Sequence, residues 1–542
     1  MMRWWGWGRD EDAIELPVAA AELLRGELGL SGDERGERVE LGAVTVPPAR
    51  LNAAARQALS AVVGAEAVAD GHEARVAHAA GRSYPDLVRL RGGDASGAPD
   101  AVVYPSESGQ LAPLLAVCAQ QGVAVIPFGG GTSVVGGVEA LPGSHHAAIT
   151  LDLSRLNALI AVDATSLTAT VEPGIFGPEL ERQLGHAGLT LGHFPQSFEY
   201  STVGGWVATR SAGQASTGYG RIDELVESVS CVTPAGELAT LDSPATAAGP
   251  SLRELVVGSE GVLGVISCAT MRVRPVPAEQ RYEAWSFSSF EAGAEAFRAI
   301  EQAGASPDVA RLSDEEETRL TMALGSSGGL SEKVGKLYLR ARGQEGGCIA
   351  FTGFDGTPDD IARRRGRTAE ILRAHGAVGL GTKPGSSWLR GRFAAPYLRD
   401  ELLDRGVMVE TLETATTWTN LANLYKTVGD ALRTTLTERG TPPAVMCHIS
   451  HLYPSGASLY FTFIVRQQQG QELEQWRAAK TAACDAIVTA GGTLTHHHAI
   501  GTDHRAWMPQ EIGPLGIDIL RTVKDRVDPA GIMNPGKLLP DG

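Results

Sequence analysis

Three consecutive histidines, His496, His497 and His498, stand near the C-terminus of the chain. An imidazole exchanges protons near neutral pH, so a histidine triplet suits general acid–base catalysis. In an extended segment, His496 and His498 face one way and His497 the other. We expect a catalytic role, against the alternative of a core or surface cluster. A metal site is not expected, because Asp503 and His504, the nearest further ligands, show no recognised zinc spacing.

A tyrosine is the second candidate. Tyr453 lies in the stretch CHISHLYPSG, which leads into a predicted strand over residues 459–465. A tyrosine on a loop beside a strand can present its phenol to a pocket as an acid or a base. Most tyrosines instead pack with a hydrogen-bonded hydroxyl, so the residue type leaves both interpretations open.

Two arginines complete the set. Arg399 stands near the start of a predicted helix that ends by Gly406, and Arg311 lies in the stretch VARLS. A guanidinium binds phosphate or carboxylate well. The net charge of −16 repels anions, so an anionic substrate would need a local basic pocket. Solvated or salt-bridged surface arginines are the alternative.

Glycine is enriched, with 66 among 542 residues, above the usual share of about 7%. Many of these glycines fall in three segments, residues 127–137 (PFGGGTSVVGG), 192–220 and 258–266 (GSEGVLGVI). A pyrophosphate needs several converging backbone N–H groups, and side chains there would block its approach. Three such segments indicate one phosphate-bearing cofactor, whereas a single one could be a flexible hinge.

Two familiar phosphate loops are excluded for the first segment. A dinucleotide fingerprint of the Rossmann type opens the helix after the first strand of its unit. Here the segment follows the second predicted strand and leads into no evident helix. A P-loop would require lysine at the position of Gly137.

The elements that must position these groups indicate an α+β fold of two or three domains. Hydrophobic periodicity predicts helices and strands in alternation. The predicted helices are 18–29, 52–68, 111–121, 177–187, 289–303, 358–374, 421–438 and 471–490. The predicted strands are 100–104, 123–126, 147–152, 158–163, 167–172, 351–354, 407–412 and 459–465, and residues 274–277 resemble a linker.

The motif order PFGGGTS, STVGGW with TRSAG, and GSEGVLGVI resembles the FAD-binding domain of the vanillyl-alcohol oxidase superfamily. Within it, the chain is most similar to the alkyldihydroxyacetonephosphate synthase family, the flavoenzymes of ether-lipid synthesis. The resemblance covers roughly residues 95–542, and the RWWGWG start is similar too. It implies a helical region at 1–94, a two-subdomain PCMH-type FAD-binding domain at 95–276, an α+β substrate (cap) domain at 277–500, and a segment at 501–542 that returns to the FAD domain.

The resemblance also implies which residues contact FAD. They are Pro127, Phe128, Gly129, Gly130, Gly131, Thr132, Ser133, Gln196, Ser197, Phe198, Glu199, Tyr200, Ser201, Thr202, Thr209, Arg210, Ser211, Ala212, Glu260, Gly261, Val262, Leu263, Gly264, Val265 and Ile266. Gln196 departs from the aspartate that the family usually has, which would weaken one polar contact. The first glycine segment has no His or Cys, so non-covalent FAD is expected.

The implied activity replaces the acyl group of acyl-dihydroxyacetone phosphate with a long-chain alcohol, without net oxidation at the flavin. By the same resemblance, Tyr453 removes the C1 proton, the histidine triplet assists, Arg399 binds the substrate phosphate, and Arg311 is needed for activity. The expected small-molecule partners are thus a lipid phosphate and a fatty alcohol.

Two other functions stay open. An FAD-linked oxidase or dehydrogenase of a 2-hydroxy acid or alcohol would share the glycine segments. Such dehydrogenases tend to carry an HxGDGNxH metal motif and a GEHGIG motif, where this chain has HLYPSGASLY and THHHAIG. That difference favours the synthase. The other function is that of a binding protein that carries a flavin but catalyses no reaction.

The bulk composition excludes several partners. A net charge of −16 argues against nucleic acid and anionic membrane surfaces. Six cysteines without a CxxC pair indicate reduced thiols, and neither a signal peptide nor a transmembrane segment is evident. We expect a cytoplasmic homodimer with no more than peripheral membrane contact.

Overall fold

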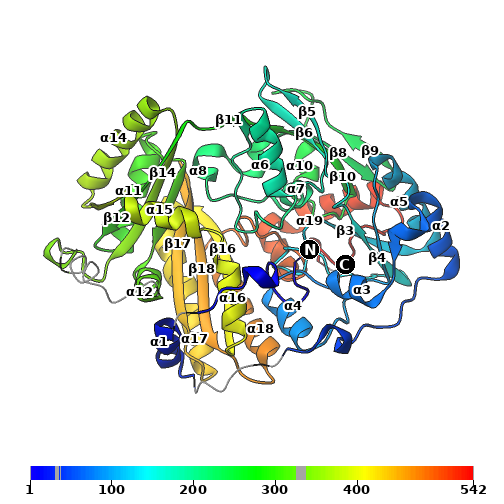
Figure 1. The fold of residues 1–542 in the computed structure, drawn as a ribbon, viewed down its shortest axis with the longest axis horizontal. Helices are drawn as coiled ribbons and strands as arrows, with labels where there is room; N and C mark the ends of the chain where they lie inside the picture. The colour runs from blue at the N-terminus through cyan, green and yellow to red at the C-terminus, as the bar shows by residue number, and fades with distance from the viewer. Residues whose placement is uncertain are drawn as a thin grey trace.

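Two units lie side by side in the computed structural model, which describes residues 2–16, 18–30, 36, 38–324, 337 and 339–540 (Figure 1). The first unit, coloured from blue through cyan to green, contains a four-stranded and a five-stranded sheet. The second, coloured green to orange, contains one large sheet. The described part of the chain therefore has the α+β character that the sequence predicts.

The first sheet has the order β1-β2-β4-β3. Its strands are β1 (Val68–Ala69), β2 (Ala101–Val103), β4 (Ala147–Asp152) and β3 (Val123–Phe128), and β2, β4 and β3 run parallel. The parallel crossover from β2 to β3 is made by α5 (Leu111–Gln121), which Gly122 ends in a left-handed conformation with φ 63°. Glycine adopts this conformation without Cβ strain, and the predicted helix end is confirmed.

The second sheet is antiparallel, with the order β5-β6-β10-β8-β9. Its strands are β5 (Leu159–Asp163), β6 (Thr168–Val171), β10 (Val265–Arg272), β8 (Val226–Thr233) and β9 (Gly236–Ala239), and α6 (Gly177–His186) and α7 (Val203–Thr209) pack with it. The predicted linker at 274–277 is partly wrong. Its first two residues form β11 (Arg274–Pro275), which pairs with β7 (Leu189–Thr190).

The seven-stranded sheet of the second unit has the order β15-β12-β14-β13-β17-β18-β16. These strands are β15 (Val378–Gly381), β12 (Glu279–Phe287), β14 (Cys348–Gly356), β13 (Val309–Ser313), β17 (Ala444–Tyr453), β18 (Gly456–Arg466) and β16 (Val407–Thr417). One apolar cluster joins the sheet to α11 (Phe290–Gln302), α14 (Pro358–Ala374), α17 (Leu421–Glu438) and α18 (Glu472–Thr489), so these helices cover one face. All four were predicted.

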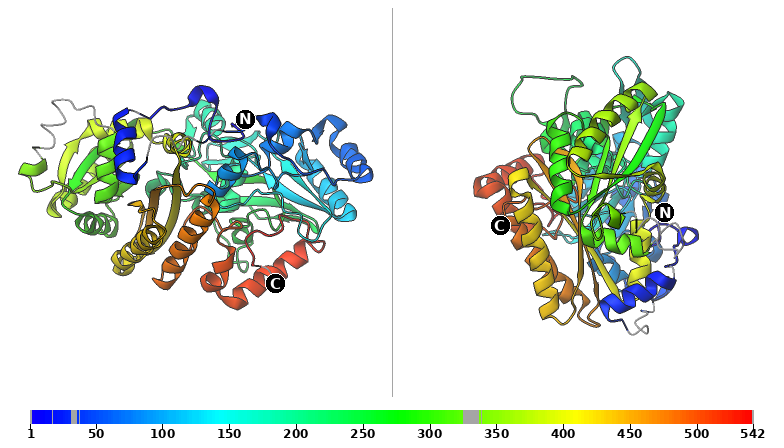
Figure 2. Two further views of the ribbon diagram at one scale, coloured as in Figure 1. Left: turned by 90° about the horizontal axis from the view of Figure 1, so that it is seen from below. Right: turned by 90° about the vertical axis from the view of Figure 1, so that its left-hand side faces the viewer.

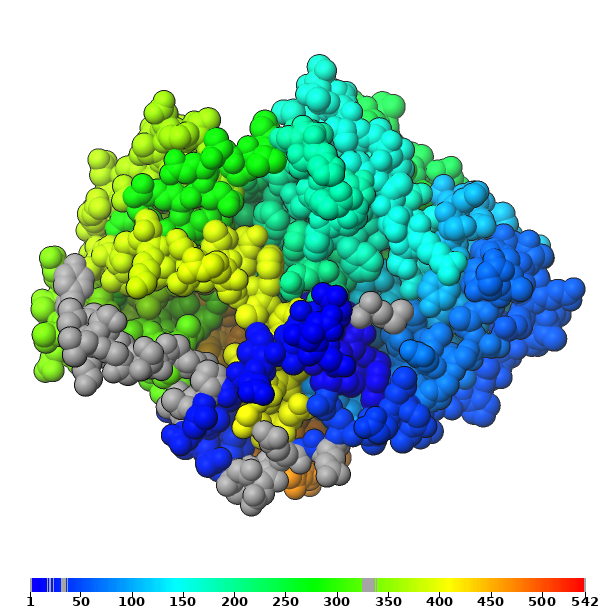
Figure 3. Space-filling model, in the orientation of Figure 1, coloured from blue at the N-terminus to red at the C-terminus, as the bar shows by residue number. Residues whose placement is uncertain are grey.

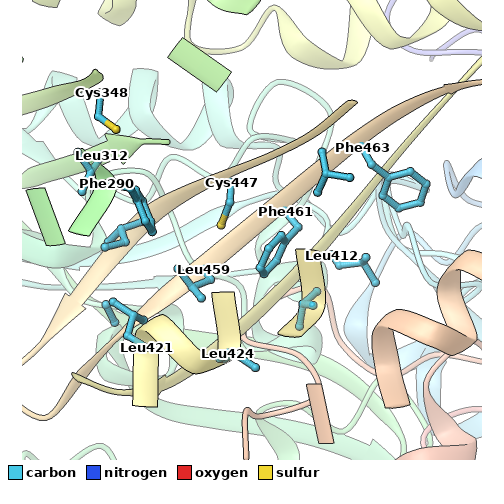
Figure 4. Packing of buried hydrophobic residues seen from close by; sticks show 14 of the residues in the cluster. Phe290, Leu312, Cys348, Leu412, Leu421, Leu424, Cys447, Leu459, Phe461 and Phe463 are labelled. Carbon is cyan, nitrogen blue, oxygen red and sulfur yellow. The ribbon is translucent and has the colours of Figure 1, made fainter. Parts of the chain in front are cut away.

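Successive side chains of β18 point to alternate faces of this sheet. Leu459, Phe461 and Phe463 are fully buried in the helix-covered core (Figure 4). Tyr460 and Thr462 point to the opposite face, where they line a cavity. Because strand side chains alternate, one strand contributes both to the core and to the cavity wall.

The described part of the N-terminal region contains the helices α1 (Val18–Leu28), α2 (Ala53–Val63), α3 (His72–Ala77) and α4 (Tyr84–Arg91), with loops between them. Its first residues, dark blue in Figure 3, lie across the junction between the two units. There the carboxylate of Asp400, on α16 (Ala395–Leu403), accepts hydrogen bonds from the backbone N–H of Trp7 at 2.5 Å and from the Arg3 guanidinium at 3.4 Å.

The C-terminal residues return to the first unit. Helix α19 (Met508–Val527) packs beside α18 in one apolar cluster and lies below the blue-to-cyan unit (Figure 2). Beyond it, Met533 pairs with Val125 of β3. The Asn534 amide donates to the backbone carbonyl of Glu260 at 2.7 Å.

Two further observations concern the whole chain. All six cysteines are unpaired, and five of them are buried. No helix in the described ranges combines the length and apolar character needed to cross a membrane.

Candidate active site

A cavity of about 540 Å³ lies between the two units. Its wall includes segments from all three glycine-rich stretches, the N-terminal region and the cavity face of the seven-stranded sheet. The predicted cofactor residues on this wall are Pro127, Phe128, Gly129, Gly130, Gly131, Thr132, Ser133, Gln196, Ser197, Ser201, Thr202, Thr209, Ser211, Ala212, Glu260, Gly261, Gly264 and Ile266. Segments that are far apart in the sequence thus converge on one space.

The glycines allow chain segments to approach one another, in addition to any ligand. A Cβ on Gly130 would lie 1.7 Å from the backbone oxygen of Tyr200, and one on Gly129 would lie 2.2 Å from the Thr202 hydroxyl. Gly131 has φ +66°, which side chains disfavour. The first two glycine segments therefore meet at distances that no other residue type permits.

The first segment also presents unused donors. Within the described part of the chain, the backbone N–H groups from Gly129 to Val134 make no hydrogen bond. Consecutive free N–H groups next to a cavity form an anion-binding concavity. The residues present therefore fit the pyrophosphate of a flavin dinucleotide.

Seven of the predicted cofactor residues do not line the cavity: Phe198, Glu199, Tyr200, Arg210, Val262, Leu263 and Val265. They hold neighbouring segments instead. Phe198 stacks on Trp206, which does line the cavity. Arg210 ends α7 in a left-handed conformation and pairs with Asp223 at 3.2 Å. Gln196 lines the cavity, but its amide donates to the backbone oxygen of Arg392 at 3.0 Å.

The histidine triplet does not adopt the extended conformation predicted for it. Residues 496–498 form a bend, and the adjacent imidazoles of His496 and His497 meet, Nδ1 to Nδ1, at 2.9 Å. The prediction that the His497 side chain faces away from those of His496 and His498 is therefore wrong. His497 and His498 line the cavity, and His496 lies next to them.

A buried carboxylate on β16 causes the bend. Glu413 accepts hydrogen bonds from the backbone N–H groups of His496 and His498 and from the Thr495 hydroxyl at 2.6 Å. The Nδ1 atoms of His497 and His498 each lie 3.7 Å from its oxygens. Burial opposes charge on Glu413, but the hydrogen bonds that it accepts from the Thr495 hydroxyl and from backbone N–H groups help to lower its pKa. The N–H groups of His496 and His498 thus bind the two oxygens of one carboxylate, which holds the bend in place.

Tyr453 ends the strand β17, next to the hairpin to β18. The prediction that it lies on a loop is therefore wrong. Its hydroxyl lies 2.6 Å from Nε2 of His496, and it does not line the cavity itself. Burial raises the pKa of Tyr453 to about 12, although the guanidinium of Arg221 acts in the opposite direction.

These contacts connect Tyr453 to the cavity through two imidazoles. Burial lowers the pKa values of His496 and His497 well below the usual range, so both are neutral at pH 7. A neutral imidazole has one donor and one acceptor nitrogen. If Tyr453 donates to Nε2 of His496, then Nδ1–H of His496 donates to Nδ1 of His497, which lines the cavity.

Arg311 and Arg399 both line the cavity, in different surroundings. The Arg311 guanidinium bonds His448 at 2.9 Å and Glu317 at 2.6 Å. Although burial opposes charge on Glu317, the His448 and Arg311 side chains lower its pKa to about 2. Arg399 donates from one terminal nitrogen to the backbone oxygen of Arg82 at 2.7 Å, while its Nε and Nη2 atoms are buried without a partner.

One group of nitrogens has dimensions compatible with a metal ion. His451, His496 and His497 each offer a ring nitrogen within 4.8 Å of the others, among the described residues. Several of these nitrogens already have partners, since His451 bonds the backbone oxygen of Gly213 at 3.0 Å and His496 bonds Tyr453. The hydrogen bonds account for this arrangement without an ion, and the absence of a metal stays a prediction.

Sequence reasoning missed part of the wall. Arg82, Ser83 and Tyr84 line the cavity, although no chemistry was predicted for residues 1–94. No local pattern marks these residues, which precede or begin an ordinary capped helix. Gly204 and Gly205 also line the cavity, and they were visible as a pair in the second glycine segment.

Two family matches define the class of protein to which the chain belongs. Residues 99–242 match the FAD binding domain family, and residues 276–538 match the family of FAD linked oxidases, C-terminal domain. With the free N–H groups and converging glycines of the cavity, these matches identify a flavoprotein with the FAD-linked oxidase architecture, and FAD as its cofactor.

Relatives that align over most of the chain identify the family within this class. The chain is 36% identical to alkyldihydroxyacetonephosphate synthase of Dictyostelium discoideum, covering 87% of this chain and 78% of the relative. It is 35% identical to the Trypanosoma brucei brucei enzyme, covering 86% and 77%. A solved structure of alkyldihydroxyacetonephosphate synthase superposes with a TM-score of 0.86 and 31% identity over 98% of both chains. The chain belongs to the alkyldihydroxyacetonephosphate synthase family, which confirms the resemblance stated from its motifs.

The close approach at Gly130 generates a first prediction. Gly130→Ala places a Cβ against the backbone of Tyr200, which cannot yield as a flexible side chain could. We expect the purified variant to lose most of its FAD, measured by absorbance near 450 nm per protein. Gly185→Ala, whose Cβ meets nothing within 4 Å, is the control. A Gly130→Ala protein with full flavin content would contradict the role assigned to this contact.

Glu413 generates a second prediction. In Glu413→Gln, the amide NH2 opposes the N–H groups of His496 and His498 and removes the charge that fixes the bend. Misplacing catalytic groups by about 1 Å can cost about 100-fold in rate, so we expect kcat to fall by roughly that factor, with KM and FAD content little changed. Glu413→Asp should recover part of the rate.

The matched control is Glu283→Gln. Glu283 is also buried, but it pairs with Arg281 and Arg365 on the seven-stranded sheet and does not contact the triplet. If this variant lost kcat to the same extent as Glu413→Gln, general destabilisation would explain both results.

Proposed function

We propose that the protein is an FAD-dependent alkylglycerone-phosphate synthase, which exchanges the acyl group of acyl-dihydroxyacetone phosphate for a long-chain alcohol. The observation that carries this proposal is one cavity that joins three features. These are the three glycine segments, the guanidinium of Arg399 with its unpaired donors, and a chain of hydrogen bonds that ends at Tyr453.

The apolar part of the cavity supports an aliphatic substrate. Away from the glycine segments, one apolar cluster contributes large side chains to the wall: Leu16, Leu24, Leu320, Leu398, Leu402, Val409, Met446 and Ile464. Burying a methylene group stabilises a complex by about 0.8 kcal/mol. A long alkyl or acyl chain in this part of the cavity would therefore contribute much of the binding energy.

The polar residues have separate tasks in this reaction. Arg399, whose Nε and Nη2 have no partner, would bind the substrate phosphate. The C1 proton of the substrate would be accepted within the chain Tyr453–His496–His497 and returned when the alcohol adds. The positive charge of Arg221 favours the ionised form of the Tyr453 phenol and so opposes the effect of burial on its pKa. Arg311 would hold His448 and Glu317 on the wall of the cavity.

FAD would be held by the free N–H groups of residues 129–134 and by the hydroxyl-rich second segment. When bound, it supplies an electron-poor ring system next to the substrate. No cysteine is among the lining residues, and none of the lining residues from the three glycine segments is a histidine, which supports non-covalent binding. Unpaired cysteines support a reducing compartment, so we propose a cytoplasmic location. A homodimer and peripheral membrane contact remain predictions.

A product assay tests the proposed function. Purified flavin-loaded protein is incubated with acyl-dihydroxyacetone phosphate and a labelled fatty alcohol, in parallel with dye-linked assays on 2-hydroxy acids. We expect label in an ether product and no reduction of the dye. Dye reduction without an ether product would establish the oxidase or dehydrogenase alternative.

Tyr453→Phe tests the proton transfer within the same assay. Loss of a general acid–base group typically costs about 100- to 10,000-fold in rate, and we expect a loss of this size with FAD still bound. The control is Tyr425→Phe, because the Tyr425 hydroxyl donates to Asp314 at 3.0 Å away from the cavity wall. Near-normal turnover of Tyr453→Phe would remove Tyr453 from the mechanism.

A further inference from the structure

Arg82 is a buried cation whose side chain meets only neutral acceptors. It is 3% exposed and lines the cavity. Its guanidinium donates to the backbone oxygens of Gly6 at 3.0 Å, Gly81 at 2.7 Å and Arg3 at 2.9 Å. A guanidinium has five N–H groups, so these three bonds leave donors unused.

Arg82 lies next to Arg399. The Arg399 guanidinium donates to the backbone oxygen of Arg82 at 2.7 Å, and its positive charge is one of the influences that lower the pKa of Arg82. Burial is the largest influence and lowers that pKa to about 10, although the carboxylates of Asp400 and Asp86 act to raise it, so Arg82 remains charged at neutral pH. Two positive charges therefore lie on one part of the wall.

The nearest carboxylates are engaged elsewhere. Asp400 binds Arg3, Arg91 and the N–H of Trp7, and Asp86 binds Arg89 at 2.9 Å. Across the part of the chain that the structure describes, neither Arg82 nor Arg399 has a carboxylate oxygen within 4.0 Å. A buried charge with no carboxylate in direct contact is unfavourable, so an anion from outside the chain would stabilise this pair.

We propose that Arg82 and Arg399 form one dicationic site for a phosphate monoester, and that Arg82 makes this site select dianions over monoanions. The proposal rests on the proposed function for the identity of the ester, and it assigns a role to a residue outside the FAD-binding and cap domains. The cofactor pyrophosphate is the other phosphate to be considered in this cavity. The free N–H groups of residues 129–134 would bind it, which would leave the guanidinium pair for the substrate.

The test compares two ligands of the same shape and different charge. Dihydroxyacetone phosphate, a dianion at pH 8, and dihydroxyacetone sulfate, a monoanion, are titrated calorimetrically into the flavin-loaded protein. We expect Arg82→Gln to weaken phosphate binding by about 10- to 100-fold, the usual effect of losing a hydrogen bond between charged groups. Sulfate binding should change by less than about threefold, and Arg82→Lys should restore part of the phosphate affinity.

A matched control separates charge from packing. Arg75 is also buried and donates only to backbone oxygens, of Pro99 and Pro47, both at 2.6 Å, but it does not line the cavity. Arg75→Gln should leave both affinities unchanged. Equal weakening by Arg75→Gln and Arg82→Gln, or equal weakening of both ligands, would overturn the proposal.

Two further outcomes separate this inference from the proposed function. If Arg82→Gln is purified without FAD, the pair serves the cofactor pyrophosphate and the proposal fails. If the wild type forms no ether product but still prefers the phosphate in an Arg82-dependent way, the site stands and the proposed function falls. If ether product forms normally and Arg82→Gln leaves phosphate binding intact, the function stands and this inference falls.

Discussion

Close backbone approach at glycine is the constraint on which the rest of the structure depends. Gly130 meets the Tyr200 carbonyl, and Gly501 meets the Val135 carbonyl, where a Cβ would lie 1.7 Å and 2.0 Å from oxygen. These contacts join the first glycine segment to the second and to the C-terminal segment. This convergence brings the segment with the free N–H groups next to the segment that follows the histidines. Residues of both segments line the cavity.

Two buried carboxylates then hold the C-terminal segment between the units. Glu413, from the seven-stranded sheet, binds the backbone of residues 496–498, and Glu260, from the third glycine segment, accepts from the N–H groups of Ile500 at 2.8 Å and Gly501 at 2.7 Å. Burial raises the pKa of Glu260 to about 7. The segment that carries the histidines is thus fixed on one side to the third glycine segment and on the other to the seven-stranded sheet.

The seven-stranded sheet shows how one strand pattern serves both stability and function. Along β18, the side chains that face the helices are fully buried, while Tyr460 and Thr462 face the cavity. A shift of register by one residue would exchange the two sets. The apolar core therefore fixes which side chains reach the cavity. Backbone oxygens hold the guanidinium groups of Arg82 and Arg399 on one part of its wall.

The sequence by itself determined the element pattern, the cofactor class and the family. Helices such as α5 and α17 follow from apolar periodicity and from glycine stops, which are local properties. The glycine segments indicated a phosphate site because glycine leaves backbone N–H groups accessible. Tertiary structure alone decided that Tyr453 ends a strand and reaches the cavity through His496, that Glu413 bends the histidine triplet, and that Arg82 joins the wall. Each of these depends on contacts between residues more than 40 positions apart, and a pattern read along the chain contains no record of which distant partner satisfies a buried polar group.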